Sequence, residues 1–238
     1  MEKTRLRVTD FTADRLNELE FENFEELYPF RENEGISWIN IDGLHDTEAL
    51  AELAEHFGLH SLVMEDVVST HQRAKFEDYP EHIFIVLRML YLEGDKSVVK
   101  SEQVSLIFGE GWVFTFQERT GDIFEGVRNR LRAGKARLRK SGSDYLAYAL
   151  SDALIDHYFN ILEQLGEKIE ALEEGLLADP RNEHLESIHS LKRELVLVRR
   201  AIWPLREVIG NWIRSESPLV QNETQLFLRD VHDHTVQV

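Results

Sequence analysis

The sequence predicts an α+β fold, in which a largely antiparallel sheet with flanking helices is followed by a long helical hairpin and one more helix. Two observations carry this prediction. Up to Gly121 the apolar residues come in short β-branched and aromatic runs bounded by glycines, as strands do. After Gly121 they recur every three or four residues, which is the spacing of an amphipathic helix. The chain is therefore expected to begin as a sheet domain and to end in helices.

Four segments of the first half are predicted as strands, at residues 37–42, 83–91, 103–108 and 112–117. The second segment is almost continuously apolar, as a strand covered on both faces would be. Residues 109–111 (Gly-Glu-Gly) join the last two strands in a short hairpin loop. Leu6 and Val8 suggest a further strand, and residues 24–27 a helical turn.

Two helices are predicted between the first two of these strands. Asp46 or Thr47 can cap the first helix, and Gly58 ends it. Its apolar face is formed by Leu50, Leu53, Ala54 and Phe57. The second helix is shorter and covers residues 61–70. Both are expected to flank the sheet.

A basic segment follows the strands, with seven cations in the thirteen residues 128–140. Because the chain as a whole is acidic, the segment is interpreted as a solvated helix that faces acidic neighbours. A surface for DNA or for a membrane is the alternative.

Two long helices come next and are predicted to form an antiparallel hairpin, since residues 178–182 (Ala-Asp-Pro-Arg-Asn) form a tight turn between them. The first arm carries a run of glutamates, and the second a run of lysines and arginines. Pro204 is expected to kink the second arm. The apolar seams of the two arms are Leu154, Tyr158, Ile161, Leu165, Ile169, Leu172 and Leu176, and Ile188, Leu191, Leu195, Val198, Ile202, Leu205 and Ile209.

The last 22 residues are predicted as a further helix, with Pro218 in its first turn. An apolar seam repeats at steps of three and four residues, as in helices that bundle. No C-cap signal follows, so we expect the helix to continue in a longer protein. The seam comprises Thr224, Leu228, Val231, Thr235 and Val238, and a polar stripe beside it comprises Asp230, Asp233, His234 and Gln237.

The composition excludes several classes of function. The chain has 238 residues and a net charge of −17, from 44 acidic residues against 27 lysines and arginines, which argues against nucleic acid as a partner. It lacks cysteine, so disulfides and thiolate chemistry are excluded. The N-terminus is no signal peptide, and the longest apolar run is about half of the roughly 20 residues that a membrane span needs, so we expect a soluble chain. No catalytic motif is present, and we expect no enzyme.

Acidic residues in three regions are candidate ligands for a hard divalent cation, because Mg²⁺ binds one or two carboxylates and keeps several waters. They are Glu65 and Asp66, Asp152 and Asp156, and Asp230 and Asp233. Spacing alone does not bring them together, and from composition alone a solvated surface carboxylate is the more common explanation for each.

Eight short motifs in sequential order then resemble the cytoplasmic part of the CorA family of magnesium transporters. The motifs are Trp-Ile-Asn-Ile-Asp-Gly (38–43), His-Ser-Leu-Val-Met-Glu-Asp (60–66), His-Gln-Arg-Ala-Lys-Phe (71–76), Ser-Glu-Gln-Val-Ser (101–105), Val-Phe-Thr-Phe-Gln-Glu (113–118), Gly-Asp-Ile-Phe (121–124), Ala-Ile-Trp-Pro-Leu-Arg-Glu (201–207) and Arg-Asp-Val-His-Asp-His-Thr (229–235).

The resemblance implies a homopentameric channel of the inner membrane for Mg²⁺, which also passes Co²⁺ and Ni²⁺, with this chain on the cytoplasmic side. It implies an α/β/α sandwich over residues 1–142, a long helical hairpin over 143–215 and, over 216–238, a stalk helix cut before the membrane. The family's two membrane helices and their Gly-Met-Asn signature do not occur in this sequence. Membrane contact is therefore expected only through a C-terminal part that these residues do not include.

The resemblance also implies weakly bound regulatory Mg²⁺ between subunits, with Asp66 of one subunit facing Asp230 of the next. Glu65, Asp152 and His234 would form a looser second site, and Asp233 would lie beside it on the stalk. Bound Mg²⁺ would hold the pore closed. The alternatives are the same domain of a related zinc transporter and a soluble acidic coiled-coil scaffold without a metal.

Overall fold

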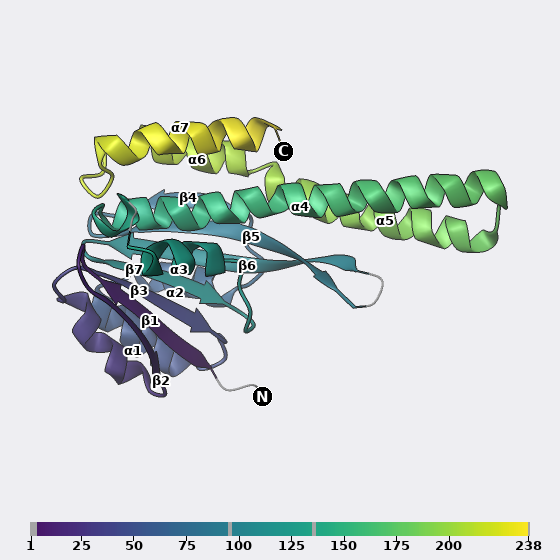
Figure 1. The fold of residues 1–238 in the computed structure, drawn as a ribbon. Helices are drawn as coiled ribbons and strands as arrows, with labels where there is room; N and C mark the ends of the chain where they lie inside the picture. Colours follow the sequence, from purple (N-terminus) through teal and green to yellow (C-terminus); the bar gives the residue numbers. More distant parts are fainter. Residues whose placement is uncertain (1–3, 95–96, 135–136, 238) are drawn as a thin grey trace.

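A computed structural model describes residues 4–94, 97–134 and 137–237 of the chain and shows one mixed sheet of seven strands (Figure 1). The order across the sheet is β2-β1-β3-β7-β6-β5-β4, and every neighbouring pair is antiparallel except β3 and β7. The largely antiparallel sheet of the prediction is confirmed. The strands are β1 (Arg5–Phe11), β2 (Leu16–Phe21), β3 (Ile36–Asp42), β4 (Lys75–Asp78), β5 (Ile83–Glu93), β6 (Val98–Gly109) and β7 (Trp112–Gln117).

Helices cover both faces of this sheet, which confirms the α/β/α sandwich (Figure 1). One face carries η1 (Phe24–Arg31), α1 (Thr47–Phe57) and α2 (Ser61–Val68). The other face carries α3 (Glu125–Arg132), η2 (Arg137–Arg139), α4 (Ser143–Ala178), α5 (Asn182–Ile202), α6 (Leu205–Arg214) and α7 (Asn222–Gln237).

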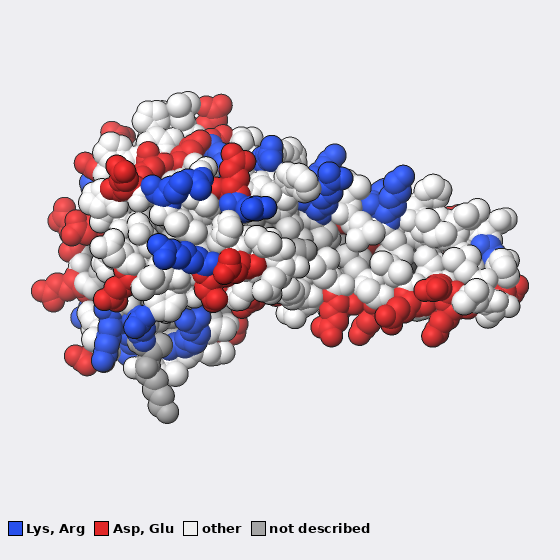
Figure 2. All heavy atoms as spheres, turned by 90° about the horizontal axis from the view of Figure 1, so that it is seen from above, with Lys and Arg blue, Asp and Glu red and all other residues white. Residues whose placement is uncertain are grey.

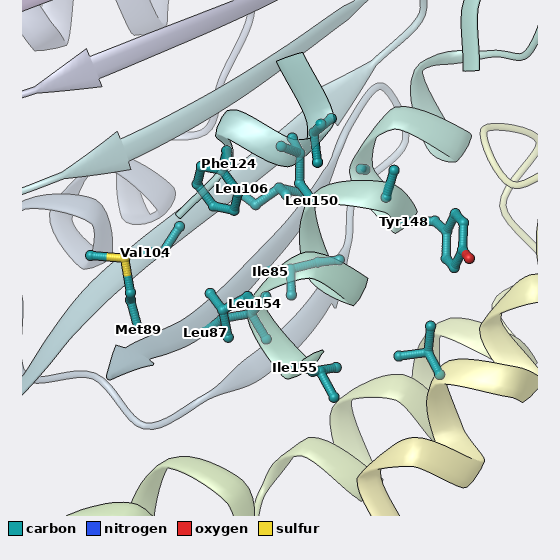
Figure 3. Packing of buried hydrophobic residues seen from close by; sticks show 14 of the residues in the cluster. Ile85, Leu87, Met89, Val104, Leu106, Phe124, Tyr148, Leu150, Leu154 and Ile155 are labelled. Carbon is teal, nitrogen blue, oxygen red and sulfur yellow. The ribbon is translucent and has the colours of Figure 1, made fainter. Parts of the chain in front are cut away.

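Two separate hydrophobic cores form because successive side chains of a strand point to opposite faces. On β5, Phe84 and Val86 belong to the core beneath α1 and α2. Ile85 and Leu87 belong to the core beneath α4, where they meet side chains such as Leu154 (Figure 3). The nearly continuous apolar run of β5 thus reflects a strand that is buried on both sides, as predicted.

The start and end of α1 follow the predicted capping. The Asp46 carboxylate accepts a hydrogen bond from the Ala49 N–H at 3.1 Å. Gly58 ends the helix with φ of 70°, a conformation that costs glycine little. α2 ends at Val68, two residues before the predicted boundary.

Strands β2 and β4 were not predicted, and both lie at the edges of the sheet. β2 is mostly exposed and its sequence, LNELEF, is acidic. β4 has only four residues. Edge strands are often short and charged, which limits pairing with other chains, and such strands lack the alternating pattern on which prediction depends.

The interpretation of residues 128–140 as one solvated helix was wrong. α3 ends at Arg132, and the 3₁₀ turn η2 occupies residues 137–139. Arg128 is 6% exposed, donates to Asp122 at 2.7 and 2.5 Å and stacks 4.7 Å from the Trp38 ring. This arginine fixes α3 to the sheet domain. Acidic neighbours do meet the segment elsewhere, where Arg132 pairs with Glu18 at 2.7 Å.

The antiparallel hairpin of α4 and α5 is confirmed, and it projects beyond the sheet (Figure 1). Figure 2 shows acidic side chains along one edge of this projection and basic side chains along the other. α5 ends at Ile202, and α6 begins after Pro204, so the predicted proline kink is a complete break. Leu205 and Ile209 therefore leave the hairpin seam and pack in α6, which contacts β4 and α7.

The apolar seam of the last helix is confirmed, although α7 begins at Asn222 rather than near Pro218. Thr224, Leu228, Val231 and Thr235 are buried, and α7 packs against α4 and α6 of the same chain. Val238 lies outside the described residues. None of the helices in the described ranges is long and apolar enough to cross a membrane.

Candidate metal centre

Two carboxylates of α4 and an imidazole of α7 lie together on the surface where these helices meet. Asp152 and Asp156 are four residues apart and share one face of α4. One ligand atom from each of Asp152, Asp156 and His234 lies within 4.8 Å of the other two. The His234 Nδ1 is 3.9 Å from the Asp152 Oδ1 and 3.6 Å from the Asp156 Oδ1. These three residues are called the α4–α7 cluster below.

Asp230 lies at the border of the α4–α7 cluster. Its Oδ2 is 4.0 Å from the His234 Nε2, one helical turn away on α7. Its side chain is 69% exposed, so this carboxylate is open to solvent or to a second molecule. The apolar seam sets the geometry, because the buried Val231 and Thr235 anchor α7 while Asp230 and His234 lie beside them.

The electrostatics of the α4–α7 cluster favour a cation. Burial, and next the nearby charge of Asp156, raise the pKa of Asp152 to about 6, although His234 and Arg130 act in the opposite direction. Burial and the charge of Asp152 also raise the pKa of Tyr148. Asp152 is therefore a carboxylate with too little positive charge around it, and a bound cation would supply that charge.

The donor atoms fit a divalent cation in two ways. At Mg²⁺–oxygen distances of about 2.1 Å, octahedral ligands stand about 3.0 Å apart when adjacent and about 4.2 Å apart when opposite. The separations of 3.6 and 3.9 Å lie between these two values, so side-chain shifts of less than about 1 Å would bring the three groups to one ion. Carboxylates suit Mg²⁺, whereas an imidazole suits Co²⁺, Ni²⁺ or Zn²⁺. The His234 Nδ1 is buried and has no hydrogen-bond partner within the described residues, so it is free to act as a ligand.

The structure places Asp66 and Glu65 away from this cluster. They belong to α2, which packs in the core on the opposite face of the sheet from α7. The Asp66 Oδ2 accepts from the Lys75 Nζ at 2.5 Å, and Lys75 also donates to the Glu77 Oε1 at 2.6 Å. Burial opposes the charge of Lys75, but these two carboxylates outweigh it and raise the pKa of the ammonium. Glu65 is exposed.

Asp233 also lies outside the α4–α7 cluster. Its side chain is 78% exposed, and its carboxylate stands 3.8 Å from the His232 Nδ1. Of the six predicted ligands, the structure thus gathers Asp152, His234 and, at the border, Asp230. Asp156 was an acidic candidate from its position but was absent from the ligand set implied by the resemblance; its spacing of four residues from Asp152 was the available signal. Lys75 as a partner of Asp66 was missed.

Comparisons with known proteins identify the family of the chain. The profile of the family described as CorA-like Mg²⁺ transporter protein matches residues 33–238. The cobalt/magnesium transport protein CorA of Thermotoga maritima is 41% identical over 237 residues, which are 100% of this chain and 68% of that protein. A putative metal ion transporter of Bacillus subtilis is 28% identical over 201 residues, with 84% of this chain and 61% of that protein covered.

The fold is also found in a solved structure, the soluble domain of CorA from Methanocaldococcus jannaschii. The TM-score is 0.78 at 18% identity, with 98% of this chain and 88% of that chain covered. The family match and the Thermotoga relative place the chain in a class of divalent-cation transporters, and the solved structure shows the same fold. The chain belongs to the CorA-like Mg²⁺ transporter family. The family is one of transporters rather than a known class of enzymes.

Proposed function

We propose that the chain is the cytoplasmic, Mg²⁺-sensing part of a divalent-cation transporter and that it regulates the pore through Mg²⁺ bound between subunits. The observation that carries this proposal is the α4–α7 cluster, which holds an undercompensated carboxylate beside an unpartnered imidazole nitrogen. The 68% coverage of the Thermotoga relative leaves room for conducting segments elsewhere in the full-length protein. Co²⁺ and Ni²⁺ are further candidate substrates.

The positions of Asp66 and Asp230 support a site between subunits. Since α2 and α7 pack on opposite faces of one sheet, the two carboxylates can approach each other only across two chains. Asp66 of one subunit would face Asp230 of the next in a homopentamer, with Glu65 beside it. Asp152, Asp156 and His234 would hold a second ion close to Asp230.

Lys75 would be the counter-ion of the metal-free state. Its ammonium neutralises Asp66 when no metal is present, so a cation arriving at Asp66 must compete with it. The competition would keep Mg²⁺ binding weak, which suits a sensor of an abundant ion.

The regulation follows as a shift of population between two states. Bound Mg²⁺ turns the repulsion between facing carboxylates into a bridge, which holds neighbouring subunits together and the pore closed. Five copies of a chain with net charge −17 carry a total net charge of −85 (5 × −17). Without Mg²⁺ these chains repel one another, and the assembly loosens.

A mixture of two variants tests whether the site lies between subunits. In a ring made only of Asp66→Asn or only of Asp230→Asn, every contact lacks one carboxylate. Random mixing restores both carboxylates at about a quarter of the contacts, because each contact joins unlike surfaces of two subunits. Resistance to protease at low and high Mg²⁺ is measured, with the oligomeric state in parallel.

We expect Mg²⁺ to protect the unmodified chain from the protease and to protect neither variant when it is assembled alone. The mixture should be protected partly. Asp14→Asn, in an exposed loop, is the control for the loss of one charge and should behave as the unmodified chain. Protection of both single variants would refute the ligand roles. A mixture no better than its components would refute the site between subunits.

The imidazole of His234 favours a second candidate for the ion, a transition metal such as Zn²⁺. A ligand that binds only the folded chain raises its melting temperature. Stronger stabilisation by micromolar Zn²⁺ than by millimolar Mg²⁺, lost in His234→Gln, would favour that ion. An acidic scaffold without a metal would show no ion-specific stabilisation.

A further inference from the structure

A basic cavity that shares no residue with the α4–α7 cluster lies between the last turns of α5, strands β5 and β6 and the segment that precedes β4. Its volume is about 1110 Å³. The lining includes five lysines and arginines but no aspartate or glutamate. The residues that matter here are Arg73, Arg88, Lys100, Arg199, Arg200 and Trp203. In a chain of net charge −17, such a concentration of cations without carboxylates is unexpected.

Most cations of this cavity have no carboxylate of the described residues within ion-pair distance. Arg88 is half-buried, and its guanidinium donates only to neutral oxygens, namely the Thr70 carbonyl at 2.8 Å and the Ser101 hydroxyl and carbonyl at 3.1 and 3.4 Å. These bonds use three of its five N–H donors, which leaves two. Burial lowers the pKa of Arg88, although the charges of Glu118 and Glu102 act in the opposite direction. The charged guanidinium therefore lacks part of its solvation, which an anion would replace.

The other cations are free to bind. Arg73, Arg199 and Arg200 are exposed and form no ion pair with any described residue. Lys100 has only a long pair with Glu93, at 3.7 Å. Guanidinium groups bind phosphate oxygens through paired N–H donors, and several of them around one cavity suit an anion with more than one phosphate.

An aromatic ring stands at the edge of the same cavity. Trp203 is 68% exposed, whereas Trp38, Trp112 and Trp212 are at most 5% exposed. The Arg199 guanidinium lies 5.1 Å from the centroid of the Trp203 ring, which holds the indole beside the cations. An exposed indole is a surface on which a nucleobase can stack.

We propose that this cavity binds a nucleoside polyphosphate. Arg73, Arg199 and Arg200 contact the phosphates, with Arg88 at the base of the cavity, and Trp203 stacks on the nucleobase. The volume exceeds what a drug-sized ligand needs, about 300–1000 Å³, so the whole molecule can enter. The site shares no residue with the α4–α7 cluster, so this proposal stands apart from the proposed metal sensing.

ATP titrations of the chain test the proposal, followed by calorimetry and by tryptophan fluorescence, with EDTA present so that no metal site contributes. Tripolyphosphate and adenosine are titrated in parallel by calorimetry. We expect saturable ATP binding, with tripolyphosphate weaker and adenosine weaker still. The affinity for ATP should fall at least tenfold in each of three variants, Arg73→Gln, Arg199→Gln and Arg200→Gln. Trp203→Leu, followed by calorimetry, should abolish the preference for ATP over tripolyphosphate.

Arg193→Gln is the matched control, since Arg193 is an exposed arginine of α5 that does not line the cavity. It should change ATP affinity less than twofold. Melting curves verify that each variant folds. If Arg193→Gln lowered the affinity for ATP as much as the cavity variants do, the binding would be unspecific attraction of ATP to positive charge, and the proposal would be overturned. Binding that fails to saturate at millimolar ATP, or equal affinities for ATP and tripolyphosphate in the unmodified chain, would also overturn it.

Discussion

The Nδ1 of His234 on α7 lies 3.9 Å from the Oδ1 of Asp152 on α4, although the two residues are far apart in the sequence. This separation is too long for a direct hydrogen bond. The Asp156 Oδ1, at 3.6 Å, is also too far, so this buried nitrogen has no hydrogen-bond partner among the described residues. Buried polar atoms normally bind something, and a gap of this length admits a shared ion or water. The Asp152 carboxylate and the His234 imidazole are therefore arranged as two ligands of one ion or water molecule.

Asp152→Asn is expected to stabilise the metal-free chain at neutral pH. The pKa of Asp152 is raised to about 6 in the folded chain, from an ordinary value near 3.8, so folding disfavours its ionised form. The resulting cost is absent below about pH 4, grows between pH 4 and 6 and is complete above pH 6. Two pKa units correspond to about 3 kcal/mol, and solvent screening reduces this to about 1–2 kcal/mol.

Urea unfolding in EDTA at pH 7.5 and pH 4 measures this difference. Asp152→Asn should raise the free energy of unfolding at pH 7.5 and leave it unchanged at pH 4. Glu167→Gln, an exposed neutralisation on the same helix, should change it by less than about 0.5 kcal/mol at either pH. An equal gain for Asp152→Asn at both pH values would contradict the electrostatic cause.

His234→Gln is expected to discriminate between metals. Removal of the imidazole takes away a ligand that Co²⁺ prefers, while the carboxylates that Mg²⁺ prefers remain. Calorimetry should show Co²⁺ affinity falling about tenfold, or about 1.4 kcal/mol, and Mg²⁺ affinity falling about threefold or less. His189→Gln, an exposed histidine of α5, should alter neither. Equal losses for both metals would mean that His234 supports the site without binding the ion.

Much of the fold could be predicted because its elements are strongly periodic. The seam of α7 was correct at Thr224, Leu228, Val231 and Thr235, since a buried helical stripe leaves a repeat of three and four residues. The edge strands β2 and β4 could not be predicted. Each pairs with a neighbour on one side only and faces solvent on the other, so it carries no strong apolar pattern.

Charged residues were the harder part, since their environment depends on residues distant in sequence. Arg128 looked like one of seven solvated cations, but Asp122 and the Trp38 ring bury it. Asp66 looked like a free carboxylate, but Lys75 neutralises it. The sequence could indicate which residues are able to bind a cation. Only the packing of α7 against α4 shows that Asp152 and His234 meet.

Arg128→Met is expected to destabilise the chain by about 3–5 kcal/mol, because it leaves the buried Asp122 without its closest cation. Guanidinium chloride unfolding measures the loss. Arg132→Met removes an exposed arginine of the same helix, paired with Glu18 and Glu125, and should cost less than about 1 kcal/mol. Similar losses in the two variants would show that burial does not determine the contribution of Arg128.

Lys75→Met is expected to strengthen Mg²⁺ binding while it weakens the metal-free chain. The ammonium now occupies the Asp66 carboxylate and holds it beside Glu77, so its removal frees a ligand and leaves two carboxylates to repel each other. A cation relieves that repulsion, and Mg²⁺ affinity should rise about threefold to tenfold, with a larger upward shift of the melting temperature. Lys192→Met, an exposed lysine of α5, is the control for the lost charge and should have little effect. Calorimetry that finds Mg²⁺ affinity unchanged or lower in Lys75→Met would refute the competition between Lys75 and the metal for Asp66.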